Sequence, residues 1–218
     1  MGISELNNIL SSLYGNLKPF TLPCPFHLQI AHKTIDIAQT REETIYHIIK
    51  YILDPKKSSI YSGNVFIPHF HSITENTYTC ITNQFIKIKE HYDKLTPYPI
   101  IHIIITFHPE YQIDGYKANS IMESLIFSLG DFFTSHQYIY AIHNKQWNAK
   151  ENRITHPHIH LAISTTNYRT GKTLDFNKST IKKWESNLLF SMEHIIAPIL
   201  EQNKSNLERI AKRYQIPL

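Results

Sequence analysis

Cysteine and glycine are both scarce in this sequence. Its 218 residues include two cysteines, Cys24 and Cys80, which lack the short spacing of a zinc-binding pair. This excludes a disulfide-rich scaffold and a cysteine-based zinc centre, and it fits a reducing cytosol. Because there are only six glycines and no repeat or Gly/Ser-rich linker, we expect one domain spanning residues 1–218.

Long apolar runs and a strong net charge are absent as well. No run approaches the roughly 20 residues that a bilayer crossing needs, and the first residues, Glu5 among them, lack the basic start of a secretory signal. We therefore expect a cytoplasmic protein without a membrane segment. Hydrophobic residues make up 42% and charged residues 18%, which is typical of a folded globular chain. The net charge of +4 is compatible with nucleic-acid binding but does not indicate it.

Short apolar runs alternate with amphipathic segments along the chain. Their periodicities predict strands at residues 27–37, 62–73, 99–107, 138–143 and 156–164. Helices are predicted over residues 3–14, 83–92, 117–133 and 176–214, the last interrupted near Pro198, with a proline-rich connector over 17–25. A further helix is expected to begin at a capping box of Thr40 and Glu43 and to end before Pro55. The expected fold class is α+β, an α/β sandwich with a central, mostly antiparallel sheet flanked by helices.

Histidines cluster at the start of one predicted strand. The segment HPHIHLAIS (156–164) places His158 and His160 two residues apart, so in a strand both side chains point to one face. His143 ends the preceding predicted strand and comes close to them if the two strands are neighbours. Three imidazoles on a rigid sheet form either a divalent-metal site with open positions or a proton-handling cluster. The alternative is a set of ordinary polar strand residues. His156, before Pro157, is the weakest candidate ligand.

Tyr51 lies near the end of a predicted amphipathic helix and is flanked by Lys50, Lys56 and Lys57. A phenolate stabilised by cations is a competent nucleophile towards a phosphodiester, and basic neighbours attract a nucleic-acid backbone. The chain has 13 tyrosines, however, and most tyrosines in a folded protein are core or rim residues. Spacing alone does not decide between these interpretations.

Three segments, taken in order, resemble the conjugative relaxases, or plasmid mobilization proteins, of the MobA/VirD-like type in the HUH endonuclease superfamily. IIKYILDPKK (48–57) resembles the segment that carries the catalytic tyrosine, and ITFHPE (105–110) is similar to the central motif of the family. AIHNKQWNAKENRITHPHIHLAIS (141–164) resembles the segment with the His-hydrophobic-His signature. The resemblance covers roughly residues 41–190, and the order of its parts makes it more specific than any one segment.

The resemblance implies a metal-dependent DNA endonuclease and transesterase with the relaxase HUH fold. Tyr51 would be the nucleophile, and His143, His158 and His160 would hold Mn²⁺ or Mg²⁺. The expected reaction is site- and strand-specific nicking and rejoining of single-stranded DNA at a plasmid transfer origin, through a 5′-phosphotyrosine, to initiate mobilization. The expected partners are the origin DNA, as single strand or hairpin, with accessory relaxosome proteins and a coupling protein.

Further residues are candidates for DNA contacts. Phosphate contacts are expected from Lys50, Lys56, Lys57, Arg169 and Lys172, with a hydrogen bond from Thr106, which stands where the family has serine. Trp147 and Tyr168 are candidates for stacking on unpaired bases. For each of these side chains the alternative is an ordinary surface position.

Two departures from the family pattern leave alternatives open. Lys145 stands where the family usually has aspartate, and the spacing between His143 and His158 is longer than typical. A catalytically degenerate, DNA-binding relaxase-like protein is therefore one alternative. A rolling-circle replication initiator is another, although its tyrosine follows the histidines whereas Tyr51 precedes them. A metal-dependent hydrolase unrelated to DNA is a third.

Overall fold

The computed structural model describes residues 26–32, 41–68, 72–92, 99–108, 111, 113–143, 147–148, 153–154, 157–174, 177–192, 201 and 205. The chain divides into two compact units, of which one is Phe26–Ser191. The other joins Met1–Pro25 to Met192–Leu218 and lies almost entirely outside the described residues. The expectation of a single domain stays a prediction. The helix and the connector expected over residues 3–25 also lie outside the described part.

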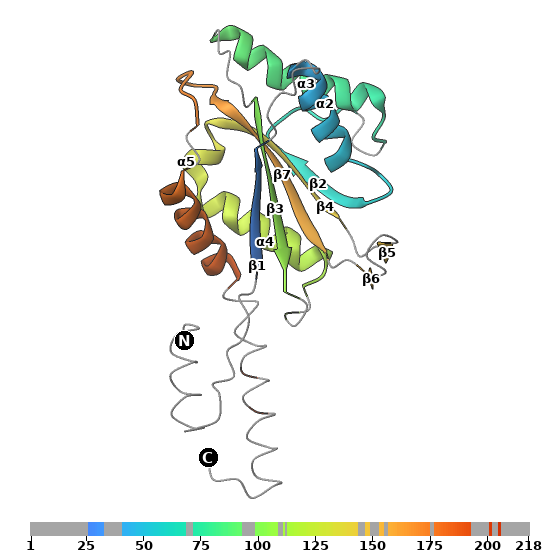
Figure 1. The fold of residues 1–218 in the computed structure, drawn as a ribbon, viewed down its shortest axis with the longest axis vertical. Helices are drawn as coiled ribbons and strands as arrows, with labels where there is room; N and C mark the ends of the chain where they lie inside the picture. Colours follow the sequence, from blue (N-terminus) through green and yellow to red (C-terminus); the bar gives the residue numbers. More distant parts are fainter. Residues whose placement is uncertain are drawn as a thin grey trace, which may run out of the picture. The chain divides into compact units, whose positions relative to one another are not determined.

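A five-stranded antiparallel sheet forms the centre of the Phe26–Ser191 unit (Figure 1). Its strand order is β1-β3-β7-β4-β2, so neighbours in the sheet are mostly distant in the sequence. The strands are β1 (Phe26–His32), β3 (Ile100–Phe107), β7 (His158–Asn167), β4 (His136–His143) and β2 (Ser58–Gly63). Every neighbouring pair is antiparallel, which confirms the expected fold class.

Helices cover both faces of this sheet, which explains why its central strands are apolar on both sides. α2 (Arg41–Ile52) and α3 (Glu75–His91) pack on one face in a buried cluster with strand residues such as Ile139, Ala141 and Ala162. α4 (Gly115–Ser128), α5 (Gly130–Phe133) and helical residues 178–192 belong to the opposite layer (Figure 1). Trp184 packs there against Phe132 and Phe133.

The helix predicted to end before Pro55 is α2, and it ends at Ile52 as expected. Its apolar side, Ile45, Ile48, Ile49 and Ile52, is fully buried. Beyond it, the Asp54 carboxylate accepts a hydrogen bond from the backbone N–H of Lys56, which closes the turn into β2. Thr40, the expected cap, lies outside the described residues.

The strand predicted over residues 62–73 is wrong. β2 starts earlier, at Ser58, and ends at Gly63. The Asn64 side chain then donates to the carbonyl oxygens of Phe133 and His136 and accepts from the N–H of Tyr138. The Gln84 amide of α3 next bonds both the N–H and the carbonyl of Phe66. Bonds between side chains and backbone groups of distant segments therefore replace the ladder bonds that would have extended the strand.

Two predicted helices have different bounds in the structure. The helix expected over 83–92 is the second half of α3, which begins at Glu75 after a capping box formed by Thr74 and Thr77. The helix expected over 117–133 is divided at Leu129 into α4 and the short α5, and Gly130, a weak helix former, follows the break.

The remaining differences are smaller. A two-stranded hairpin, β5 (Trp147–Asn148) with β6 (Arg153–Ile154), lies in the segment that was expected to be a polar connection. Of the helix expected over 176–214, residues 178–192 are helical, and most of the rest lies outside the described residues. Within the described part, no helix is both long and apolar enough to cross a membrane.

Candidate active site and metal centre

Three histidines meet where β4 ends and β7 begins. His143 is the cross-strand partner of His158, and His160 lies two residues further along β7 on the same face. The ring centroids of His143 and His160 are 4.2 Å apart, and those of His158 and His160 are 4.8 Å apart. One nitrogen from each of the three rings lies within 4.8 Å of the other two. The antiparallel register thus gathers the predicted ligand set in one place.

Burial keeps the imidazoles of His143 and His160 neutral. Loss of solvent lowers the pKa of His143 to about 4, and the nearby His158 and Lys57 act in the same direction. Burial, followed by the neighbouring histidines, holds the pKa of His160 far below its ordinary value. A neutral imidazole offers a nitrogen lone pair, which is what a metal ligand requires.

The hydrogen bonds of His143 and His160 indicate which of their ring nitrogens are available to a metal. His143 Nε2 lies 2.9 Å from the carbonyl oxygen of Ile52, which can only accept, so Nε2 carries the proton and Nδ1 keeps its lone pair. His160 Nδ1 lies 2.8 Å from Nε2 of His102. The other nitrogen of His160, Nε2, is buried and has no hydrogen-bond partner among the described residues. An orphaned buried nitrogen beside two further imidazoles fits a divalent cation.

His102 belongs to the site but was not predicted from the sequence. It lies on β3 opposite Ala162, within the apolar run IIHIIITF, and is 7% exposed. The only signal in the sequence is one histidine inside a strongly apolar strand. Its contact with His160 follows from the β3–β7 register, which local patterns do not give.

The last turn of α2 places Tyr51 over this cluster. The Tyr51 ring stands edge-on to His160, His143 and His102, with centroid separations of 5.1, 5.6 and 6.2 Å. Its neighbour Ile52 is buried, whereas Tyr51 is 46% exposed. The phenol therefore lies beside the histidines and remains accessible to a substrate.

A cation lies against the Tyr51 ring. Lys57 Nζ is 4.6 Å from the ring centroid, and the Asp54 carboxylate holds the same ammonium at 3.2 Å. The turn that follows α2 thus places the positive charge of Lys57 beside Tyr51, at the end of the helix. A tyrosine, a lysine and three clustered imidazoles together can bind a phosphodiester and supply a nucleophile to it.

The family model for the nuclease domain of MobA/VirD2-like relaxases matches residues 51–188. The chain belongs to the relaxase family. The match covers more than half of the sequence, starts at Tyr51 and includes the three clustered histidines. It supports DNA endonuclease activity and, with it, DNA binding. No curated protein and no solved structure matches the chain.

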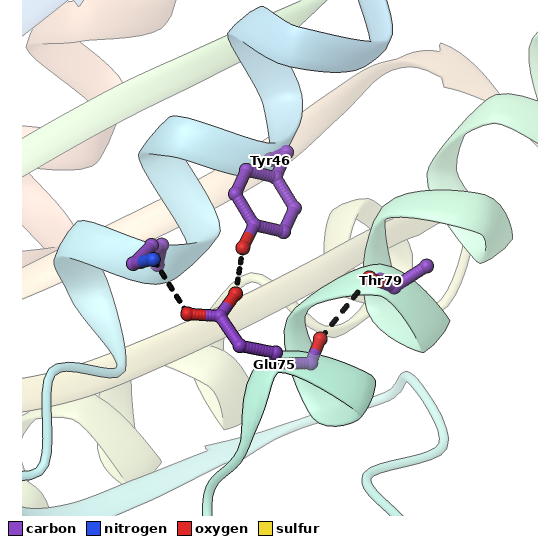
Figure 2. A network of polar contacts seen from close by, with 4 residues as sticks. Tyr46, Glu75 and Thr79 are labelled. Carbon is purple, nitrogen blue, oxygen red and sulfur yellow. Dashed lines mark hydrogen bonds and ion pairs between the residues drawn. The ribbon is translucent and has the colours of Figure 1, made fainter.

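Lys50, one of the expected DNA-binding residues of this relaxase, is engaged in a contact between helices. Its ammonium lies 2.6 Å from the Glu75 carboxylate at the start of α3, and the Tyr46 hydroxyl bonds the other oxygen of the same carboxylate (Figure 2). Glu75 also accepts a hydrogen bond from Thr79 through its backbone carbonyl. The network ties α2, the helix that carries Tyr51, to α3 on the side where Lys50 lies.

The other expected DNA contacts of the relaxase are divided between two places. Thr106 is the cross-strand partner of His158, and its hydroxyl lies 3.4 Å from the carbonyl oxygen of His27. Lys56 and Lys57 lie in the turn after α2. Arg169 and Lys172 lie beyond the opposite end of β7, in a turn that the Asn167 side chain closes.

Four further residues were singled out in the sequence. Tyr168, in that turn, bonds the Thr134 carbonyl through its hydroxyl. Trp147 lies in β5, but its side chain lies outside the described part. Lys145, which stands where the family usually has aspartate, and His156 lie outside the described residues.

Proposed function

We propose that this relaxase nicks and rejoins one strand of DNA at a specific site, the transfer origin of a plasmid, with Tyr51 as nucleophile. The observation that carries the proposal is the position of the Tyr51 ring, 5.1 Å from His160 and 5.6 Å from His143 between centroids, above a set of neutral imidazoles.

In the proposed reaction, the Tyr51 oxygen attacks phosphorus, and the bond from phosphorus to the 3′ oxygen breaks. The phenol loses its proton, and the leaving oxygen gains one to become a 3′-hydroxyl. The product is a 5′-phosphotyrosine, whose bond retains the energy that the reverse reaction needs to rejoin the strand.

His143, His158 and His160 would hold Mn²⁺ or Mg²⁺, which when bound polarises the scissile phosphate. Mn²⁺ should bind more tightly because three imidazoles form a softer ligand set than Mg²⁺ prefers. Lys57 lies beside the Tyr51 ring and adds positive charge where negative charge develops on the phenol oxygen and the phosphate.

The biological context is part of the same proposal. The enzyme would act in the cytoplasm, on an origin exposed as single strand or hairpin, together with accessory relaxosome proteins and a coupling protein. Lys56, Lys57, Arg169 and Lys172 would contact phosphates, with Thr106 as a hydrogen-bond donor beside the nick. Lys50 would contribute less because Glu75 already neutralises it.

A labelled single-stranded oligonucleotide that carries the cognate origin tests the proposal. Incubated with wild-type protein and Mn²⁺, it should form a covalent adduct that migrates with the protein in a denaturing gel. Tyr51→Phe should form none while still binding the oligonucleotide. Tyr116→Phe is the matched control, since this tyrosine is 82% exposed on α4, in the other helical layer.

Two outcomes would count against the assignment. An adduct that persists in Tyr51→Phe removes Tyr51 from the nucleophile role. Origin binding without an adduct in Mn²⁺ or Mg²⁺ favours the degenerate, DNA-binding alternative. The position of Tyr51 ahead of the histidines and the match to the relaxase nuclease domain both speak against a rolling-circle initiator.

A further inference from the structure

Among the described residues, His102 forms the one side-chain hydrogen bond that reaches the ring of His160, the most buried of the three clustered histidines. Its Nε2 lies 2.8 Å from Nδ1 of His160, and the two rings are tilted by 32°. Both residues are buried, at 7% and 1% exposed. A buried imidazole needs polar partners, because its nitrogens have lost the water that they would otherwise bond.

The direction of this hydrogen bond decides whether His160 can be a ligand. A neutral imidazole carries one proton, on either Nδ1 or Nε2. If Nδ1 of His160 is the donor, its Nε2 holds a lone pair towards the cluster. If His102 donates instead, the proton of His160 sits on Nε2 and blocks coordination. Two neutral rings at 2.8 Å allow either arrangement, so the geometry alone leaves both directions open.

The neighbouring ligand shows how a fixed direction arises. His143 faces the Ile52 carbonyl, an obligatory acceptor, and its Nδ1 is thereby kept free of a proton. His160 faces an imidazole, which acts as an acceptor only while its own proton sits on Nδ1. The orphaned Nε2 of His160, buried and aimed at no acceptor among the described residues, favours the same outcome because a proton there would be an unsatisfied donor.

We propose that His102 is a positioning residue that accepts a hydrogen bond from Nδ1–H of His160 and so keeps the Nε2 lone pair of His160 directed at the metal. The inference rests on the proposed metal site. The hydrogen bond fixes both the tautomer and the ring orientation of the ligand, as outer-shell partners of metal-bound histidines do in general. Here the partner is a neutral ring and not a carboxylate, so it adds no negative charge to the site.

The tautomer can be measured in the metal-free protein by long-range ¹H–¹⁵N correlation with ¹⁵N-labelled histidine. Wild-type His160 is expected to carry its proton on Nδ1, and His102 also on Nδ1. A wild-type His160 that carries its proton on Nε2 overturns the inference, whatever the activity of the enzyme. This readout needs neither substitution nor metal, so a variant that fails to fold does not remove the test.

Metal affinity provides the second measurement. Mn²⁺ binding is followed by electron paramagnetic resonance for wild type, His102→Leu and His102→Gln. His102→Leu should bind Mn²⁺ roughly 10–100-fold more weakly, and His102→Gln, whose amide oxygen can accept the same bond, should recover most of that loss. His136→Gln is the matched control, since His136 is equally buried at the far end of β4 and bonds the Phe132 carbonyl.

The outcomes separate this inference from the proposed function. His102→Leu that folds and binds Mn²⁺ as tightly as wild type overturns the positioning role. Weakened binding in His102→Leu, with recovery in His102→Gln, supports it even if no covalent DNA adduct forms, and in that case only the nicking proposal fails. Equal losses in His102→Leu and His136→Gln would indicate a general packing effect and would also overturn the inference.

Discussion

At the scale of single residues, the site combines groups that local sequence patterns reveal with groups that they do not. The i, i+2 spacing of His158 and His160 is a local feature of a strand, and the sequence was sufficient to place both rings on one face. His102 and the Ile52 carbonyl act across 58 and 91 residues of chain, through a strand register and a helix packing. No local pattern encodes such contacts, so both were missed.

Substitution of Lys57 should separate a direct effect on the reaction at Tyr51 from a general attraction of DNA by positive charge. We expect Lys57→Ala to slow adduct formation by about tenfold at low salt, because the ammonium that lies 4.6 Å from the Tyr51 ring centroid is lost. Lys57→Arg should retain most of the rate. Lys56→Ala is the control, and single-turnover kinetics with saturating oligonucleotide is the measurement. A larger loss in Lys56→Ala than in Lys57→Ala would contradict this role.

The histidine cluster should also make stability depend on pH. The pKa of His143 is about 4 in the folded protein and about 6.5 when unfolded, so the unfolded state binds more protons between these values. The contribution of His143 to the free energy of unfolding is therefore fully present above pH 6.5. About 3 kcal/mol of it is lost as the pH falls towards 4. Urea unfolding between pH 7.5 and 4, with a chelator present to keep the protein free of metal, measures this loss of unfolding free energy. His143→Gln should show a shallower dependence, and an unchanged slope would refute the assignment.

At the scale of secondary-structure elements, strands with continuous β-branched runs were predictable and elements with mixed signals were not. β3 was predicted within one residue because its sequence, IIHIIITF, allows little else. The bounds of β2 were wrong because Asn64 and Gln84 bond backbone groups in distant parts of the chain. The intrinsic strand and helix propensities of residues do not reflect such contacts, which depend on the tertiary structure. The start of α3 was missed because its capping box, Thr74 with Thr77, was not recognised in the sequence.

The contact between α2 and α3 gives a prediction at this scale. Glu75→Gln removes the ion pair with Lys50 and weakens the bond to Tyr46 (Figure 2). Because both charged side chains are about half exposed, the loss of unfolding free energy should stay below about 1 kcal/mol. Chemical denaturation measures the loss, with Glu90→Gln on the same helix as control. A loss of several kcal/mol would mean that this network, and not the buried isoleucines of α2, holds the helix in place.

At the scale of the whole molecule, the strand order could not be predicted from the sequence. The periodicities located β1, β3, β4 and β7, and the alternation of elements favoured an antiparallel sheet. The order β1-β3-β7-β4-β2 depends instead on which apolar faces fit together in space. This order places β7 in the middle of the sheet, so its histidines have neighbours on both sides. His143 comes from β4 and His102 from β3.

Metal binding should stabilise the whole folded unit, because the three proposed ligands are brought together only in the folded chain. Mn²⁺ at about 100 times its dissociation constant should add about 2.7 kcal/mol to the free energy of unfolding. Thermal unfolding with and without Mn²⁺ tests this in wild type and in the double variant His158→Ala, His160→Ala. The double variant should gain nothing, whereas Arg169→Ala, beyond the other end of β7, should gain as much as wild type. Equal gains in all three proteins would place the ion elsewhere.

The bond from His143 Nε2 to the Ile52 carbonyl, 2.9 Å long, has a consequence for engineering this scaffold. Ile52 is the residue next to Tyr51, so the backbone of α2 links the proposed nucleophile directly to a proposed metal ligand on β4. A designer who transplants the helix that carries this tyrosine from another relaxase must therefore keep the position of its last carbonyl relative to the end of β4. If that carbonyl moves out of reach of His143, the incoming tyrosine loses its fixed distance to the proposed metal site, even in a chimera that folds well.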